Sequence, residues 1–408
     1  MPTLVVEPFV PTFAASDVAD LHSRLDHARW PEQETCPLDD DAAEQKSPFS
    51  WGRGPSLELM KELARGWREF DLGAAQTRWR SFKHYKAKIE GFTIHFIHER
   101  SSRPNAFPLI LCHGWPGGFF EFLHTIKGLT EPDDPAAPAF DVVIPSMPGY
   151  AWSSAPTTAK WTMQDTSRLY NELMLGLGYD KYAAQGGDWG SITARCLGSL
   201  HPEHCIAVHL NYCPVFPALT GESPQGLRLY YNWMPSFVLG AKRQRELENA
   251  LAYLEKGHAY DAMQMLTPRT PAYGLNDSPI GLLAWIGEKM LPGIDGAEGK
   301  PDATLTRDAL FLAVSIYWFT GAIGTSFLPY ALNPNFLTYL SDPTFHLPNF
   351  ALSSFPEEIL LPTRRDAGKT GALRWYKEAE EGGHFAALEQ PKVFVEHLRE
   401  AMGVLLAK

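Results

Sequence analysis

Cysteine is scarce in this sequence. Among 408 residues there are five cysteines, at Cys36, Cys112, Cys196, Cys205 and Cys213, and no CxxC pair. An odd number of widely spaced cysteines argues against a disulfide framework. The cysteine content therefore favours a reducing compartment, and we expect a cytoplasmic location.

Long apolar runs and basic clusters are missing as well. No segment offers the roughly 18 uninterrupted apolar residues of a membrane span. Residues 1–8 lack the basic start and apolar stretch of a signal peptide. A net charge of -11, without a long basic cluster, argues against nucleic acid as a partner. We therefore expect neither a membrane anchor nor a nucleic-acid partner.

What is present is the composition of a globular protein, with 45% hydrophobic and 20% charged residues. Two continuous apolar runs, residues 107–112 and 140–145, predict strands that are buried on both faces of a sheet. Residues 92–98 alternate like a half-buried strand. Strands that alternate with helices predict the α/β class, with a mostly parallel sheet and an active site at the carboxyl ends of its strands. The other predicted strands are 182–184, 209–212, 349–355 and 373–376, and the helices between or after them are 166–177 and 392–402.

The alternation of strands with helices is absent from residues 1–90, and it stops again within residues 214–347. In residues 1–90, Ser16 and Asp17 can cap a helix that carries Leu21, Leu25 and Ala28, and a second helix begins near Ser56. We expect an N-terminal helical extension packed on a core formed by residues 91–213 and 348–408. Residues 214–347 predict a helical lid over the pocket. The expected lid helices are 227–239, 242–260, 280–289 and 307–321.

The stretch that organises the chain is Gly186-Gly187-Asp188-Trp189-Gly190. It follows a predicted strand and precedes a predicted helix, which is the layout of a nucleophile elbow with Asp in the place of Ser. Small residues two before and two after the nucleophile let the strand and the helix pack closely. The alternative is an ordinary glycine-rich turn with a capping Asp. Asp188 is the predicted nucleophile.

A carboxylate nucleophile needs partners, and in this architecture the order along the chain is nucleophile, acid, histidine. The candidate histidine is His384, in a glycine-flanked loop before the last helix. The candidate acid is Glu358, with Glu357 as the rival; a carboxylate there would orient the imidazole. The candidate oxyanion donors are the backbone N–H groups of Trp115 and Trp189.

Two other sets of residues are weaker candidates for a site. His201 and His204 have H-x-x-H spacing, but Pro202 disturbs the helix that would hold them and no third ligand is evident. Cys112 ends an apolar run and packs more readily as a small hydrophobe than as a nucleophile. Neither a metal nor a cofactor is expected.

Three motifs carry a family resemblance. They are His-Gly-Trp-Pro-Gly-Gly at 113–118, Gly-Gly-Asp-Trp-Gly at 186–190 and Gly-Gly-His-Phe-Ala-Ala at 382–387. In this order they resemble the microsomal-type epoxide hydrolases of the α/β-hydrolase superfamily, and residues 276–282 of the lid and 28–31 near the N-terminus resemble that family too. The likeness covers nearly the whole chain. The missing membrane anchor makes the chain similar to the soluble bacterial and fungal members.

The resemblance implies the α/β-hydrolase fold and the hydrolysis of a small-molecule epoxide to a vicinal diol through a covalent ester on Asp188. His384 matches the base that activates water. Glu358 matches the acid behind it, because residues 355–358 fit the pattern Phe-Pro-x-Glu/Asp at the fourth place; Glu357 would take this role if the alignment slips by one. Tyr260 and Tyr330 match two lid tyrosines that hold the epoxide oxygen.

Two competing functions were considered. Haloalkane or haloacid dehalogenases share the Asp-His-acid triad but use halide-binding groups in place of a tyrosine pair. A catalytically silent binding protein would be expected to have lost at least one of the five positions. The sequence leaves open the substrate, the carbon that is attacked, the physiological role, whether detoxification, carbon use or natural-product tailoring, and assembly into a homo-oligomer.

Overall fold

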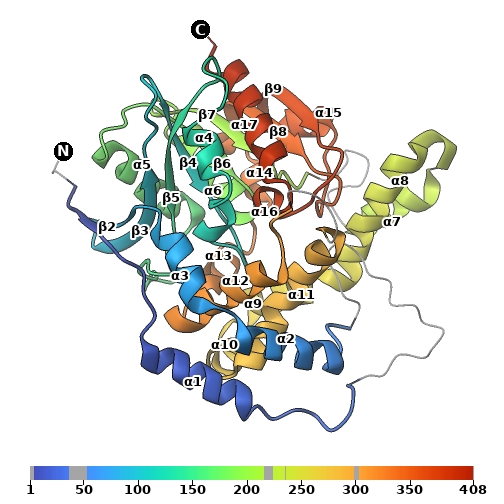
Figure 1. Cartoon of the computed structure of the whole chain (residues 1–408). Helices are drawn as coiled ribbons and strands as arrows, with labels where there is room; N and C mark the ends of the chain where they lie inside the picture. Colours follow the sequence, from blue (N-terminus) through green and yellow to red (C-terminus); the bar gives the residue numbers. More distant parts are fainter. Residues whose placement is uncertain (1–3, 36–52, 216–223, 235, 298–302, 408) are drawn as a thin grey trace.

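The computed structural model describes residues 4–35, 53–215, 224–234, 236–297 and 303–407 (Figure 1). Its centre is a nine-stranded sheet with the strand order β1-β2-β3-β5-β4-β6-β7-β8-β9. The pairs from β5 through β9 are parallel, whereas β1, β2 and β3 pair antiparallel. The mostly parallel sheet confirms the predicted fold class. The strands are β1 (Val6–Pro8), β2 (His84–Ile89), β3 (Phe92–Glu99), β4 (Phe107–Cys112), β5 (Phe140–Pro145), β6 (Tyr182–Gly186), β7 (Cys205–Leu210), β8 (Leu347–Ser354) and β9 (Gly371–Glu378).

Both faces of the central strands are covered. Along β4, Leu109 and Leu111 belong to one buried cluster, and Ile110 and Cys112 belong to another. This double burial explains why the sequence of β4 is a continuous apolar run instead of an alternating one. The principal helices that pack on the sheet or on one another are α4 (Ile126–Thr130), α5 (Met163–Gly176), α6 (Asp188–Leu200) and α17 (Pro391–Leu405).

The first ninety residues contain the predicted helices and two strands that the sequence analysis missed. Helices α1 (Ala15–Asp26), α2 (Leu57–Glu69) and α3 (Leu72–Arg80) precede β2. Leu21 and Trp67 are fully buried, and α1 and α2 pack against lid helix α11 (Pro279–Ala297). The cap prediction for α1 was wrong, because Ala14 is the N-cap residue. The second helix begins near Ser56 as expected, and the Ser56 side chain caps it. The N-terminal extension is not purely helical, because β1 and β2 join the sheet. The sequence does not reveal these strands, since β1 has only three residues and β2 has mostly polar ones.

The lid helices gather at one end of the sheet (Figure 1). The predicted helix 242–260 is broken, because α8 ends at Ala252 and α9 begins at Ala259, with a π-turn at Tyr253–Gly257 between them. The predicted helix 227–239 is also two elements, since α7 ends at Trp233. The lid helices are α7 (Pro224–Trp233), α8 (Ser236–Ala252), α9 (Ala259–Leu266), α10 (Arg269–Asp277), α11 (Pro279–Ala297), α12 (Arg307–Thr320), α13 (Leu328–Leu332) and α14 (Thr338–Ser341).

Short helical turns complete the chain. They are η1 (Phe119–Phe122), η3 (Thr325–Phe327), η4 (Pro343–Phe345), α15 (Arg364–Ala367), η5 (Gly368–Thr370) and α16 (Ala386–Glu389). Within the described ranges, no single helix has the length and apolar character of a membrane span. The bent pair Arg307–Thr320 and Thr325–Leu332 passes that test by length and composition alone.

Candidate active site

The turn between β6 and α6 has the geometry predicted for a nucleophile elbow. Asp188 has a φ of 48°, which places a non-glycine residue in the left-handed region. Such a conformation is strained and persists only where the surrounding structure enforces it. A Cβ atom at Gly186 would overlap the carbonyl of Gly190, and a Cβ atom at Gly190 would overlap the carbonyl of Cys112. The two glycines therefore allow the close packing that holds Asp188 at the tip of the turn.

The two carboxylate oxygens of Asp188 have different partners. The backbone N–H of Trp115 donates to Oδ1 at 2.8 Å. Nε2 of His384 lies 3.4 Å from Oδ2. Asp188 also begins α6, where the helix dipole favours a negative charge. Three segments that are distant in the sequence thus meet at one carboxylate.

His384 is held from behind by Glu358. Nδ1 of His384 lies 2.7 Å from Oε1 of Glu358, whose side chain is only 2% exposed. The same Oε1 atom accepts the backbone N–H of Ile359 at 2.7 Å. Glu358, and not Glu357, is therefore the residue that contacts the imidazole. The backbone of Glu357 forms a bridge to Gly383.

The surroundings of His384 favour its protonated form. Burial by itself opposes a positive charge, but the carboxylates of Glu358 and Asp188 outweigh it and hold the pKa of His384 well above its ordinary value. An imidazolium between two carboxylates is the expected resting state of this group. Neutralisation of Asp188 would remove one of the two charges that sustain it.

The two candidate tyrosines lie over the nucleophile on separate lid helices. Tyr260 in α9 stacks on the Trp115 ring at a centroid distance of 5.1 Å, and Tyr330 in α13 meets the Trp189 ring edge-on at 5.0 Å. The two tyrosine rings are 6.0 Å apart. Burial is the main cause that raises the pKa of both well above the usual range, so both hydroxyls keep their protons at neutral pH.

A cavity lies between the nucleophile and these tyrosines, and we call it the front cavity. One part is lined by Asp188, Trp189, Tyr260 and Tyr330. The adjoining part is lined by Trp115, Tyr260, Lys289 and His384. Six of the seven predicted residues, all but Glu358, thus line these two adjoining parts, and Glu358 lies behind His384. The backbone N–H of Trp189 remains a predicted donor.

Several residues at this site were missed by the sequence analysis. The Tyr253 hydroxyl lies 3.5 Å from that of Tyr260, and Nζ of Lys289 lies 4.5 Å over the Tyr260 ring. The Tyr212 ring contacts His384 edge-on at 5.6 Å. Glu121 lies near Asp188 in a second, smaller cavity. None of the four belongs to a motif with a mechanism of its own, so no local signal in the sequence could have found them.

The other sets of residues considered do not form sites. Among the described residues no group of three or more metal-ligating side chains is found. Nδ1 of His204 lies 2.8 Å from the carbonyl of Asp180. Cys112 is buried, and burial raises the pKa of its thiol well above the usual range, which disfavours the nucleophilic thiolate.

Fold and geometry together define a class. A parallel sheet, an elbow Asp, a later buried acid and a late histidine are the order and arrangement of an α/β-hydrolase with a carboxylate nucleophile. A model of the epoxide hydrolase N terminus matches residues 6–122, and a model of the alpha/beta hydrolase fold matches residues 108–267.

Relatives and solved structures agree with this class. The chain is 31% identical to epoxide hydrolase 1 of Sus scrofa over 98% of its own length and 89% of that protein. It superposes on the structure of Aspergillus niger epoxide hydrolase with a TM-score of 0.81, at 29% identity, covering 98% of this chain and 97% of the other. It superposes on juvenile hormone epoxide hydrolase from Bombyx mori with a TM-score of 0.82, at 25% identity, covering 99% and 95%. The chain belongs to the epoxide hydrolase family, as its motifs predicted, and a dehalogenase is not favoured.

Proposed function

We propose that this enzyme hydrolyses a small-molecule epoxide to a vicinal diol in two steps, through an ester on Asp188. The observation that carries this proposal is the double contact of the Asp188 carboxylate, with the Trp115 N–H on one oxygen and His384 on the other. An epoxide carbon is saturated, so its attacker must be ionised at neutral pH and must later offer a carbonyl to water. A carboxylate meets both needs, whereas a serine hydroxyl does not.

In the first step, a carboxylate oxygen of Asp188 attacks an epoxide carbon, and the carbon–oxygen bond of the ring breaks. The departing oxygen stays on the substrate as an alkoxide, which is strongly basic. Tyr260 and Tyr330 hydrogen-bond to this oxygen, and one of them gives it a proton. Burial raises the pKa of both phenols, so each hydroxyl carries its proton at neutral pH and can give it to the alkoxide, which is the stronger base.

The ester changes the state of His384. Esterification removes the negative charge of Asp188, and the pKa of His384 then falls. The imidazolium can return its proton to the tyrosinate and become a base. The charge on Asp188 would thus hold His384 protonated until the ester forms.

In the second step, His384 takes a proton from water, and the water oxygen attacks the ester carbon. The oxyanion is stabilised by the backbone N–H groups of Trp115 and Trp189. The bond between the ester carbon and the substrate oxygen breaks, and the diol oxygen receives the proton from His384. Glu358 orients the imidazole and stabilises its positive charge.

Single-turnover hydrolysis of styrene oxide in oxygen-18 water tests this mechanism. The first diol should carry an unlabelled oxygen taken from Asp188, and the peptide that contains Asp188 should gain the label. An Asp188→Asn variant is the control and should form no diol in the first turnover. Label that enters the first diol directly would mean that water attacks the epoxide itself, and the covalent mechanism would be wrong.

We also propose a cytoplasmic location for this enzyme. Cys112, Cys196, Cys205 and Cys213 are free and buried in the described part of the chain, which supports a reducing, cytoplasmic location. Fractionation of the source cells tests the location. Light scattering of the purified protein tests whether it forms a homo-oligomer.

A further inference from the structure

A second cavity lies against Asp188, and we call it the rear cavity. It is lined by Asp188, His384, Glu121 and Asn211, together with Phe122 and Phe394. Tyr260 and Tyr330 line the front cavity and not this one. The volume open to water is about 10 Å³, which is close to the room that a single water molecule needs. The two parts of the front cavity measure about 50 and 30 Å³ in the same way, so the rear cavity is the smallest of the three spaces and has room for about one water molecule beside Asp188 and His384.

Glu121 is fixed at the wall of this cavity by the loop that follows Trp115. It lies in η1, and its Oε1 atom accepts the backbone N–H of Gly118 at 2.9 Å. A Cβ atom at Gly117 would overlap the same Oε1 atom, so glycine is needed there for the carboxyl group to adopt its position. The loop that supplies the Trp115 N–H therefore also holds the Glu121 carboxyl group.

The charges around Glu121 favour its neutral form. Burial raises its pKa to about 8; the Asp188 carboxylate adds to this rise, and His384 opposes it. The phenol of Tyr317 also lies within electrostatic reach of Glu121, and its hydroxyl donates to the carbonyl of Gly117. In the resting enzyme at pH 7, Glu121 is therefore mainly a neutral carboxyl group, which can hydrogen-bond to water without a second negative charge beside the Asp188 carboxylate.

We propose that the rear cavity holds the water that hydrolyses the ester, and that Glu121 is the residue that positions this water. The inference rests on the proposed two-step function and names a residue for its second step. The water gives one hydrogen to Nε2 of His384, and it donates a hydrogen bond to a carboxyl oxygen of Glu121 with the other. The water oxygen attacks the ester carbon of Asp188. Glu121 exchanges no proton in this step. It acts through the water and is a positioning residue.

Stopped-flow and rapid-quench experiments with styrene oxide separate the two steps. Intact-protein mass spectrometry follows the alkyl-enzyme, and the diol is measured in parallel. For Glu121→Leu we expect ester hydrolysis to slow at least about tenfold, ester formation to change less than about threefold, and the ester to accumulate in the steady state. Glu121→Gln keeps the size and the hydrogen bonds of the neutral carboxyl group, so it should hydrolyse the ester at pH 7 within about threefold of the wild-type rate.

A control variant and the pattern of rates distinguish a role of Glu121 in positioning the water from a role in packing alone. Glu131→Gln changes the charge of a surface glutamate that binds Ser102, and it should alter neither step. Equal slowing of both steps in Glu121→Leu, or wild-type ester hydrolysis in that variant, would overturn the role of Glu121. A Glu121→Gln variant as slow as Glu121→Leu would overturn it as well. If the wild-type enzyme itself forms no ester, the proposed function fails, and that result is distinct from the other three.

Discussion

The backbone N–H of Trp115 donates a 2.8 Å hydrogen bond to Oδ1 of Asp188, across 73 positions of sequence. The donor expected to stabilise the oxyanion of the ester thus already contacts the free carboxylate. Under the proposed mechanism this bond keeps Oδ1 as the carbonyl oxygen of the ester and leaves Oδ2 to attack the epoxide. Because the donor is in place before reaction, little reorganisation is needed when the charge develops.

Gly114 is predicted to be indispensable for this contact. A Cβ atom at Gly114 would overlap Oδ1 of Asp188, so Gly114→Ala must displace the carboxylate or the loop. Displacement of a nucleophile by about 1 Å can cost about 100-fold in rate. We expect kcat/KM to fall by about that factor, with an unchanged far-ultraviolet circular dichroism spectrum. Gly91→Ala, at an exposed turn, is the control for general loss of stability and should keep the wild-type kcat/KM.

The charge of Asp188 is predicted to set the pKa of His384. Asp188→Asn removes a negative charge 3.4 Å from Nε2, so the protonated imidazole loses stabilisation and its pKa should fall. Nuclear magnetic resonance titration of the His384 ring measures this pKa. Asp141→Asn, whose carboxylate binds Tyr179 and the backbone of Ser101, should leave the pKa of His384 unchanged. An equal pKa in wild type and Asp188→Asn would contradict the switch proposed for His384.

The tyrosine pair is predicted to act in the first step alone. Tyr330→Phe should slow ester formation about 10- to 100-fold, and the double variant with Tyr260→Phe should slow it further, because proton donation is then lost altogether. Single-turnover kinetics report this rate. Tyr376→Phe, whose hydroxyl binds Glu378 away from the cavity, is the matched control. Unchanged ester formation in the double variant would exclude both tyrosines as proton donors.

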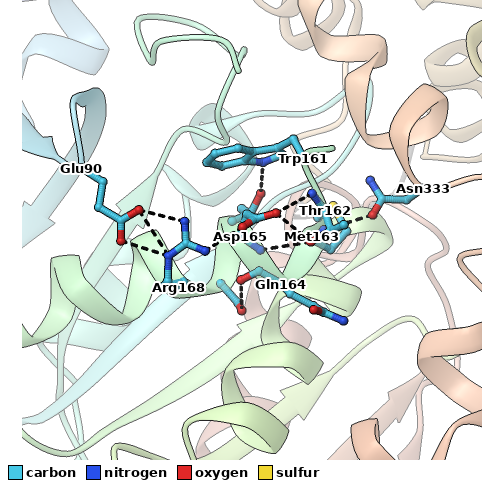
Figure 2. Close-up of polar contacts among 10 residues, drawn as sticks. Glu90, Trp161, Thr162, Met163, Gln164, Asp165, Arg168 and Asn333 are labelled. Carbon is cyan, nitrogen blue, oxygen red and sulfur yellow. Dashed lines mark hydrogen bonds and ion pairs between the residues drawn. The ribbon is translucent and has the colours of Figure 1, made fainter. Parts of the chain in front are cut away.

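Asn333 is predicted to anchor the segment that carries Tyr330. Its Oδ1 atom accepts the backbone N–H of Met163 at the start of α5 at 3.1 Å (Figure 2). The same atom accepts the hydroxyl of Tyr339 at 3.1 Å. Its Nδ2 atom donates to the carbonyl of Pro329 at 3.0 Å. Asn333→Leu removes three hydrogen bonds among buried groups, so we expect the free energy of unfolding to fall by about 2 kcal/mol or more.

Urea unfolding measures the effect of Asn333→Leu, and the rate of ester formation shows whether Tyr330 moves. The control is Gln164→Leu, an amide-to-leucine change at an exposed position one residue from Met163. It should alter the free energy of unfolding by less than about 0.5 kcal/mol. Equal effects of the two substitutions would mean that Asn333 is not an anchor.

Buried histidines are predicted to make the protein sensitive to acid. His84 binds His95 at 2.9 Å inside the core, and burial lowers the pKa of His84 to about 4. The unfolded chain takes up a proton near pH 6.5 that the folded chain binds only near pH 4, so stability falls as the pH decreases through this interval. The loss from His84 is about 3 kcal/mol. Urea unfolding at pH 7.5, 6 and 4.5 measures it, and a free energy of unfolding that stays constant over this range would contradict the prediction.

The sequence by itself determined the elements that depend on a short stretch of neighbouring residues. The apolar runs of β4 and β5 identify strands that must be buried on both faces, and the glycines at 186 and 190 identify a turn that only small residues allow. The late histidine motif at His384 was readable as well. The break at Tyr253–Gly257 was not, because a π-turn leaves the helical spacing of its neighbours almost intact.

Tertiary structure alone decided which side chains meet. The pattern Phe-Pro-x-Glu favoured Glu358 over its neighbour Glu357, but the structure decides which of them contacts the histidine: the backbone of Glu357 bridges to Gly383, and the side chain of Glu358 contacts the imidazole. The same holds for Glu121, whose carboxyl group accepts the Gly118 N–H of the loop after β4 and lines the same cavity as Asp188. Such contacts depend on the packing of distant segments, for which the local pattern of residues carries no signal.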